Sequence, residues 1–474
     1  MRVYSITGLA LSATTASAQL NQLAKAAGKS YFGTGTDNGE LYDSAYVKIT
    51  SSTENYGQLT PANGQKWDQT EPNQGTFSFA NGDVVPNFAK KNQQVVRCHT
   101  LLYRSQLPSW VTSETWTAET LTSMLETHIS NVAGHYKGQC YSWDVVNEAI
   151  DDDGEYRDTV FFQALGTDYI PLAFKAAAAA DPDAKLYYND YNIEATNAKQ
   201  KKTVELVKLV KDAGERIDGV GLQGHFIVGS MSSQEDLESV MNEFVAAGVS
   251  EVAYTEFDVK FDSLPYDEAG LEQQAQDYTT VIKACLNVEA CVGWTVWDWT
   301  DKYSWVPNTF PGQGGACLYD ENLEPKPAFY SVSSVLAAAT SSPVPTSASS
   351  GNVKASATHV ISAVAGSASS ASSANSTGVV AANQTQPTAA RATPTTLATL
   401  PLSSSATEAV ISASQAAATT GQGLAPTASA LSSALVDTAS AAADAAPTAA
   451  DAASAARPSR VPCSKKRRSH ARRA

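Results

Sequence analysis

Short runs of β-branched and aromatic residues alternate with longer stretches of helical periodicity over residues 19–330. Eight such runs occur, at residues 31–37, 56–60, 94–102, 141–148, 185–189, 219–226, 251–259 and 292–298. Strands that alternate with helices are typical of βα units and a parallel sheet. Several runs begin apolar and end polar or acidic, as barrel strands do when their carboxyl ends build an active site. The pattern therefore predicts the α/β class and a (β/α)8 TIM barrel.

Helical segments between the runs support this architecture. Apolar residues recur every three or four positions in residues 117–136 and again in residues 203–210. We expect such segments to form the helices that cover the outside of the barrel.

The first 18 residues have the pattern of a secretion signal. Arg2 opens the chain, an apolar stretch follows, and Ala16-Ser17-Ala18 gives the small-x-small pattern that signal peptidase cleaves before Gln19. A buried first helix is the alternative, which the cleavage pattern disfavours. We therefore expect a secreted, extracellular protein. No later run of about 20 apolar residues occurs, so no membrane span is expected.

The composition changes near residue 336, where a catalytic domain predicted over residues 19–335 should end. Beyond Tyr330 the sequence has no Trp, Tyr or Phe, and Ala, Ser, Thr and Pro dominate. Residues 336–456 are predicted to be a disordered, glycosylated stalk, because this composition cannot offset the entropy of ordering. Residues 457–474 form a basic cluster. This cluster has three possible roles, which the sequence does not distinguish: weak attachment to anionic wall polymer, a dibasic processing site, or a solvated charge run without function.

The formal charge of -15 argues against general nucleic-acid binding and suits a soluble protein acting on a neutral substrate. Six cysteines in a secreted chain predict disulfides, with Cys285 and Cys291 as the best candidate pair. The pairing of Cys98, Cys140, Cys317 and Cys463 stays open. No CxxC or HExxH spacing occurs, so neither a metal site nor a cofactor is expected.

Two glutamates close predicted strands and point to hydrolytic chemistry. Glu148 ends CYSWDVVNE on the fourth run, and Glu256 lies in VAYTEFDV on the seventh, across the barrel from it. A retaining glycosidase needs two carboxyl groups about 5–5.5 Å apart. His225 and Asp258 could form a polar network that orients Glu256 and keeps it ionised. A structural ion pair is the alternative for either glutamate taken alone.

Six segments in this order resemble glycoside hydrolase family 10, a family of (β/α)8 xylanases. They are TLLYRSQLPSW, WDVVNE, LYYNDYN, GLQGH, TEFD and TVWDWTDKYSW, and the resemblance covers residues 26–335. It implies a fungal secreted endo-1,4-β-xylanase that cleaves xylan with retention through a covalent glycosyl-enzyme. Glu148 would be the acid/base and Glu256 the nucleophile. A monomer is the default expectation.

The resemblance also implies residues that bind the substrate on its non-reducing side. Asn63 and Lys66 would grip xylose hydroxyls there, and Tyr103 would lie in the same pocket. His99 would lie near the sugar that is cleaved, and Asn147 would contact its 2-hydroxyl.

Four further residues are carried over from the resemblance. Gln223 and His225 would support the nucleophile. Trp297 and Trp305 would form an aromatic wall against the sugar ring. Ordinary core packing is the alternative for the two tryptophans.

The chain departs from the family pattern in the same glycone pocket. The usual Glu-Asn reads Ala62-Asn63, the usual Trp-His reads Tyr103-Arg104, and Cys98 replaces a common Gly. Binding of the second xylose should weaken, because a carboxylate is missing. The first alternative is therefore a retaining glycosidase of the same family acting on another plant glycan, such as a saponin oligosaccharide (tomatinase-like). An idle, wall-attached binding protein is the second, which the retention of both glutamates disfavours.

Overall fold

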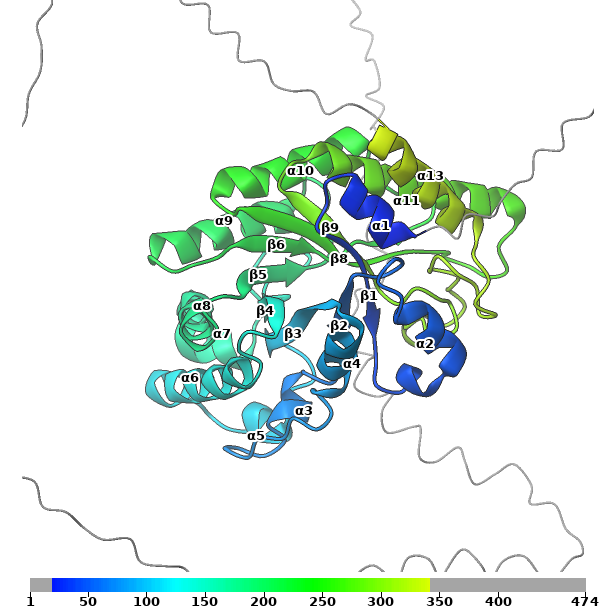
Figure 1. Ribbon diagram of the computed structural model, residues 1–474. Helices are drawn as coiled ribbons and strands as arrows, with labels where there is room; N and C mark the ends of the chain where they lie inside the picture. The colour runs from blue at the N-terminus through cyan, green and yellow to red at the C-terminus, as the bar shows by residue number, and fades with distance from the viewer. Residues whose placement is uncertain (1–18, 342–474) are drawn as a thin grey trace, which may run out of the picture. The chain divides into compact units, whose positions relative to one another are not determined.

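Nine parallel strands form the centre of the protein, for which a computed structural model describes residues 19–341. They are β1 (Tyr31–Thr36), β2 (Gln58–Pro61), β3 (Val95–Tyr103), β4 (Cys140–Asn147), β5 (Lys185–Asp190), β6 (Gly219–Leu222), β7 (His225–Ile227), β8 (Glu251–Lys260) and β9 (Cys291–Val296). Neighbours follow the order β6-β5-β4-β3-β2-β1-β9-β8, and β8 pairs back onto β6 to close the barrel (Figure 1). The predicted (β/α)8 barrel is confirmed.

The sixth predicted strand is the one that differs from its expected form. Residues 219–226 divide into β6 and β7, which both pair with β8 and are separated by Gln223 and Gly224. Gly224 has a φ of +76°, a conformation that favours glycine, and a Cβ there would lie 3.1 Å from the ring of Tyr254. The other strands begin and end within two residues of the prediction.

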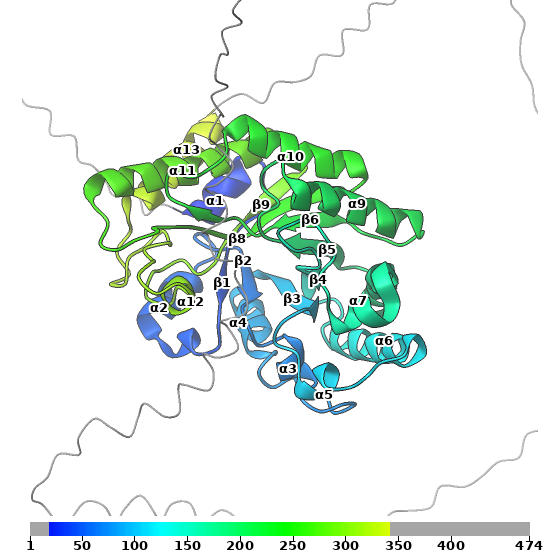
Figure 2. The same ribbon diagram turned by 180° about the vertical axis from the view of Figure 1, so that it is seen from behind.

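Helices surround the strands in both views (Figures 1 and 2). They are α1 (Leu20–Ala26), α2 (Ser44–Thr50), α3 (Trp67–Thr70), α4 (Val84–Asn92), α5 (Ser109–Thr112), α6 (Ala118–His135), α7 (Val160–Leu165), α8 (Tyr169–Ala180), α9 (Ala198–Asp212), α10 (Gln234–Ala247), α11 (Glu268–Asn287), α12 (Val306–Thr309) and α13 (Pro327–Ser341), with 3-10 turns η1 (Glu40–Tyr42) and η2 (Gly166–Asp168). Both predicted helical segments lie in helices, α6 and α9. Thr117 caps α6 in a capping box, and Asn197 caps α9.

The folded part continues past the predicted boundary at residue 335. Helix α13 runs to Ser341, and Leu336 is fully buried in the core. The apolar spacing of the helix therefore extends six residues into the Ala- and Ser-rich composition. The expected secretion signal, most of the stalk and the basic cluster lie outside the described residues. Within residues 19–341 no helix is long and apolar enough to cross a membrane.

Two disulfides join parts of the barrel. Cys285 at the end of α11 is bonded to Cys291 at the start of β9, as the sequence predicts. Cys98 on β3 is bonded to Cys140 on β4, which resolves one pairing that the sequence left open. Cys317 is buried and carries a free thiol.

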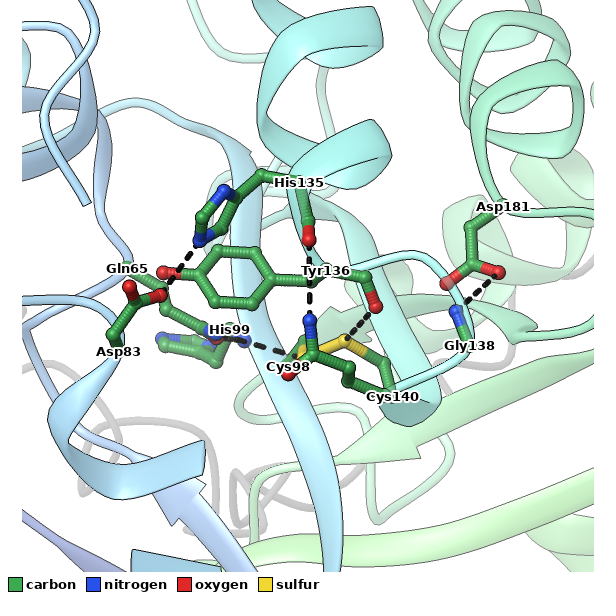
Figure 3. The surroundings of a disulfide bond; sticks show 10 residues. Gln65, Asp83, Cys98, His99, His135, Tyr136, Gly138, Cys140 and Asp181 are labelled. Atoms are coloured by element: carbon green, nitrogen blue, oxygen red, sulfur yellow. Dashed lines mark hydrogen bonds and ion pairs between the residues drawn. A yellow bond between two sulfur atoms is a disulfide. The ribbon is translucent and has the colours of Figure 1, made fainter. Parts of the chain in front are cut away.

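The Cys98–Cys140 disulfide lies beside the end of α6, at Tyr136 (Figure 3). Gln65 donates from Nε2 to the sulfur of Cys98 at 3.6 Å, and its Oε1 accepts from the backbone N–H of His99 at 3.0 Å. Gln65 therefore connects the disulfide on β3 to the backbone of His99, a predicted substrate-binding residue on the same strand.

We expect loss of this disulfide to destabilise the barrel more than loss of the other one. The Cys98–Cys140 bond closes a separation of 42 residues and the Cys285–Cys291 bond one of 6, which corresponds to about 4 and about 2 kcal/mol of chain entropy. Urea unfolding of Cys98→Ala/Cys140→Ala should show the larger loss of unfolding free energy, with Cys285→Ala/Cys291→Ala as the matched control. Equal losses would contradict the expectation.

Candidate active site

Two largely buried carboxylates stand at the carboxyl-terminal end of the barrel. Glu148 follows the last residue of β4, with 6% of its surface exposed, and Glu256 lies on β8 with 7% exposed. Glu148 has a φ of +55°, a rare conformation for a residue with a side chain, and its N–H donates to the carbonyl of Asn189 at 2.9 Å. Backbone strain of this kind concentrates at functional sites.

Side-chain amides connect the two carboxylates. Asn189 at the end of β5 donates from Nδ2 to Glu256 Oε1 and to Asn147 Oδ1, both at 2.9 Å. Gln223 donates from Nε2 to Glu148 Oε1 at 3.2 Å and to Asn147 Oδ1 at 3.5 Å. Glu148 and Glu256 therefore belong to one polar cluster, as their positions on facing strands predict.

Gln223 contacts Glu256, the residue it is expected to support, through its backbone and not through its side chain. The amide of Gln223 contacts Glu148 and Asn147 instead, while its backbone carbonyl accepts from the N–H of Glu256 at 2.9 Å. Gln223 follows the end of β6, next to β5, and its amide reaches the residues at the end of β4. The side-chain amide that donates to Glu256 belongs instead to Asn189.

Glu256 lies beside a histidine that is held as a cation. His225 Nε2 lies 3.4 Å from Glu256 Oε2, and His225 Nδ1 lies 3.0 Å from Asp258 Oδ2, which also accepts from Trp305 Nε1 at 2.8 Å. Burial disfavours the cation, but Asp258 and Glu256 outweigh it and raise the pKa of His225 to about 10. Burial likewise opposes ionisation of Glu256, yet His225, His99 and Lys66 lower its pKa below the usual value. The site thus keeps Glu256 negative, as a nucleophile requires.

Glu148 lies among different groups. Arg104 donates from Nε to Glu148 Oε2 at 3.1 Å, so a guanidinium and the amide of Gln223 contact opposite oxygens of this carboxyl group. Burial and the charge of Glu148 raise the pKa of Tyr103 well above its usual value, so the phenol stays neutral. The sequence marks Arg104 only as a departure from the family pattern and does not indicate its contact with Glu148.

A second network covers the predicted glycone pocket. Asn63 Oδ1 accepts from Lys66 Nζ at 3.1 Å and from Gln106 Nε2 at 3.0 Å, and Lys66 also donates to Gln106 Oε1 at 2.5 Å. Lys66 Nζ lies 5.6 Å from the ring centroid of Tyr103. Asn63, Lys66 and Tyr103, three of the predicted binding residues, thus lie close together. Gln106 was missed, although it lies in the quoted segment TLLYRSQLPSW.

His99 points into the barrel from β3. Its Nδ1 lies 2.9 Å from Asp144 Oδ2 on β4, and Arg97 forms an ion pair with the same carboxylate. The ring of His99 meets Trp297 edge to face, with centroids 5.8 Å apart. The imidazole of His99 is therefore buried between the carboxylate of Asp144 and the ring of Trp297.

The two predicted wall tryptophans are partly exposed, in contrast to the fully buried Trp294. Trp297 directly follows β9, and its ring packs so closely on Gly35 that a Cβ there would approach to 2.9 Å. Trp305 packs against His225, with ring centroids 4.9 Å apart. Both side chains therefore lie at the edge of the carboxylate cluster, where a flat sugar face could stack on them.

The chain is similar to known proteins in both sequence and fold. Residues 19–335 match the model of the family described as glycosyl hydrolase family 10. The chain belongs to this family. Endo-1,4-beta-xylanase 1 of Humicola insolens is a relative that is 55% identical over 333 residues, 70% of this chain and 77% of the relative.

Solved structures of xylanases match this chain along nearly their whole length. Endo-1,4-beta-xylanase XylE of Penicillium canescens is 43% identical with a TM-score of 0.65, covering 68% of this chain and 98% of its own. A GH10 xylanase from Bispora sp. MEY-1, solved with xylobiose, is 41% identical with a TM-score of 0.64 and covers 67% and 99%. The family thus accounts for the folded part of this chain.

Proposed function

We propose that this chain is a retaining endo-1,4-β-xylanase in which Glu256 is the nucleophile and Glu148 the acid/base. The observation that carries the assignment is the unequal environment of the two carboxylates: burial opposes ionisation of Glu256, but the hydrogen bond with His225 lowers its pKa below the usual value. Family membership and xylanase relatives at 55% identity support xylan as the substrate and do not favour a saponin oligosaccharide.

The reaction would proceed in two displacements. Glu256 attacks the anomeric carbon while Glu148 gives its proton to the departing glycosidic oxygen, leaving a sugar esterified to Glu256. Glu148 then takes a proton from water, which attacks the same carbon and releases Glu256. The side-chain amides of Asn189 and Gln223 both donate to Asn147 Oδ1. The Nδ2 of Asn147 is therefore the group that would contact the 2-hydroxyl of the sugar. Bonds to that hydroxyl can strengthen in the transition state.

The extracellular location and the monomeric state belong to the same proposal. The pattern Ala16-Ser17-Ala18 supports secretion, and the Arg- and Lys-rich cluster at residues 457–474 supports weak attachment to anionic wall polymer. The N-terminal sequence of the protein recovered from culture medium tests secretion. We expect this protein to begin at Gln19, after cleavage of the signal.

Product analysis on β-1,4-xylan and on a plant glycoalkaloid saponin, run side by side, tests the proposed substrate. Short xylo-oligosaccharides from xylan, with an intact saponin, are the expected result. Inert xylan with a released saponin oligosaccharide would keep the barrel and the two glutamates but overturn the substrate.

Replacing His225 with asparagine should make the enzyme lose activity in acid. Asparagine never carries a charge, so the pKa of Glu256 should rise and more of the nucleophile should be protonated at low pH. The acidic limb of the profile of kcat/KM against pH should therefore move to higher pH. An unchanged acidic limb would show that His225 does not keep Glu256 ionised.

A stability measurement gives an independent check on the same histidine. The folded pKa of about 10 exceeds the usual value of 6.5, so the contribution of His225 to folding is complete below about pH 6.5 and is lost as pH rises through 10. The unfolding free energy of His225→Asn should therefore be lowest relative to the parent near pH 5 or 6, and the difference should shrink towards pH 10. A constant difference would contradict this pH dependence.

A further inference from the structure

We propose that Asp37 supplies the carboxylate of the glycone pocket and binds the second sugar on the non-reducing side, in place of the carboxylate that Ala62 lacks. This inference rests on the proposed xylanase function. It concerns a residue at the end of β1 that the sequence did not single out.

The strand register places Asp37 beside the altered position. Thr36, the last residue of β1, is paired with Pro61, the last residue of β2, and the N–H of Ala62 donates to the carbonyl of Thr36 at 2.9 Å. Asp37 and Ala62 are therefore the next residues of two adjacent parallel strands, at the same level of the barrel mouth. A carboxylate missing from one strand end is present on its neighbour.

Hydrogen bonds fix the carboxylate of Asp37 towards the pocket. Its Oδ2 accepts from Asn63 Nδ2 at 2.7 Å, and its Oδ1 accepts from the N–H of Asn38 at 2.8 Å. The N–H of Asp37 itself donates to Glu40 Oε2 at 2.7 Å. A carboxylate held in this way loses little further freedom when it binds a hydroxyl group.

Asp37 is also connected to the cation of the pocket. Asn63, which donates to Asp37 Oδ2 at 2.7 Å, accepts from Lys66 Nζ at 3.1 Å, so one amide joins the carboxylate to the amine. Burial lowers the pKa of Lys66, and the negative charge of Asp37 is one of the charges that oppose this effect. Asp37 is only partly buried, so a sugar can reach it. An acceptor, an amide and a cation then line one side of the pocket, which suits a ring of hydroxyl groups that both donate and accept.

Aryl glycosides of two lengths test this role. Asp37→Ala and the isosteric Asp37→Asn should lower kcat/KM on an aryl β-xylobioside by about 10- to 100-fold, as expected for loss of a charge-assisted hydrogen bond. Both variants should leave kcat/KM on the aryl β-xyloside, which lacks the second glycone sugar, within about twofold. Asn38→Ala changes the same loop without removing the carboxylate and should act on both substrates like the parent.

A second variant tests the replacement itself. Ala62→Glu should recover most of the lost kcat/KM in the Asp37→Ala background but give no gain in the parent, where two carboxylates would be placed side by side. Equal effects of Asp37→Ala on the two glycosides, or no effect on either, would overturn the inference while the parent still cleaves xylan. A parent that cleaves neither glycoside would instead overturn the proposed function.

Discussion

Glu256→Ala should lower kcat on xylo-oligosaccharides by more than about 10⁴-fold, because it removes the group that forms the covalent intermediate. Azide should restore turnover of an aryl β-xylobioside. The small anion fits the space left by the side chain and attacks the anomeric carbon from the same face as the lost carboxylate. The bond to the aryl oxygen breaks as the bond to azide forms, so the product should be the α-xylobiosyl azide. NMR of the product measures the configuration.

A matched control lies on the same strand. Glu251 begins β8 at the opposite end of the barrel and accepts from the hydroxyls of Tyr141 and Tyr187. Glu251→Gln keeps the shape and an acceptor oxygen, and it should keep normal turnover. Substantial activity of Glu256→Ala without azide would rule out Glu256 as the nucleophile.

Strand order and the two carboxylates could be predicted because both leave local patterns in the sequence. Each strand is a short run bounded by polar residues, and a glutamate at its carboxyl end must lie at the barrel mouth once the strands are parallel. The division of β6 from β7 could not be predicted in this way. It depends on the φ of Gly224 and on the ring of Tyr254, a residue thirty positions away.

The contacts within the site depend on pairs of residues that are distant in sequence. Asn189 joins Asn147 and Glu256, and Arg104 reaches Glu148 from the adjacent strand. A sequence motif identifies the residues of one strand. It does not show whether a side chain of that strand contacts the strand on one side or the strand on the other. Gln223 shows the consequence, since its amide faces Glu148 although its motif associates it with the nucleophile.

The two carboxylates have different neighbours, and this difference fits the two roles proposed for them. His225 Nε2, 3.4 Å from Glu256 Oε2, lowers the pKa of Glu256, which suits the proposed attack on the sugar. Glu148 has donors on both oxygens, from Arg104 and Gln223, which hold the group in one orientation. Such preorganisation is what positions a proton donor at the glycosidic oxygen.

Glu148→Ala should have an effect that depends on the leaving group. On xylo-oligosaccharides, whose departing oxygen needs a proton, kcat/KM should fall by about 10²- to 10⁴-fold. On a 2,4-dinitrophenyl β-xylobioside, whose phenolate leaves without a proton, kcat/KM should change little. Turnover should then stop at the glycosyl-enzyme, because water lacks its base, and a burst of dinitrophenolate should be seen by absorbance.

Azide distinguishes this variant from the loss of the nucleophile. Azide needs no base, so it should attack the sugar bound to Glu256 and displace the carboxylate in a second inversion. The product should therefore be the β-xylobiosyl azide, opposite in configuration to the azide expected from Glu256→Ala. If Glu148→Ala gave the α-azide and Glu256→Ala the β-azide, the roles of the two glutamates would have to be exchanged, with the barrel and the retaining mechanism unchanged.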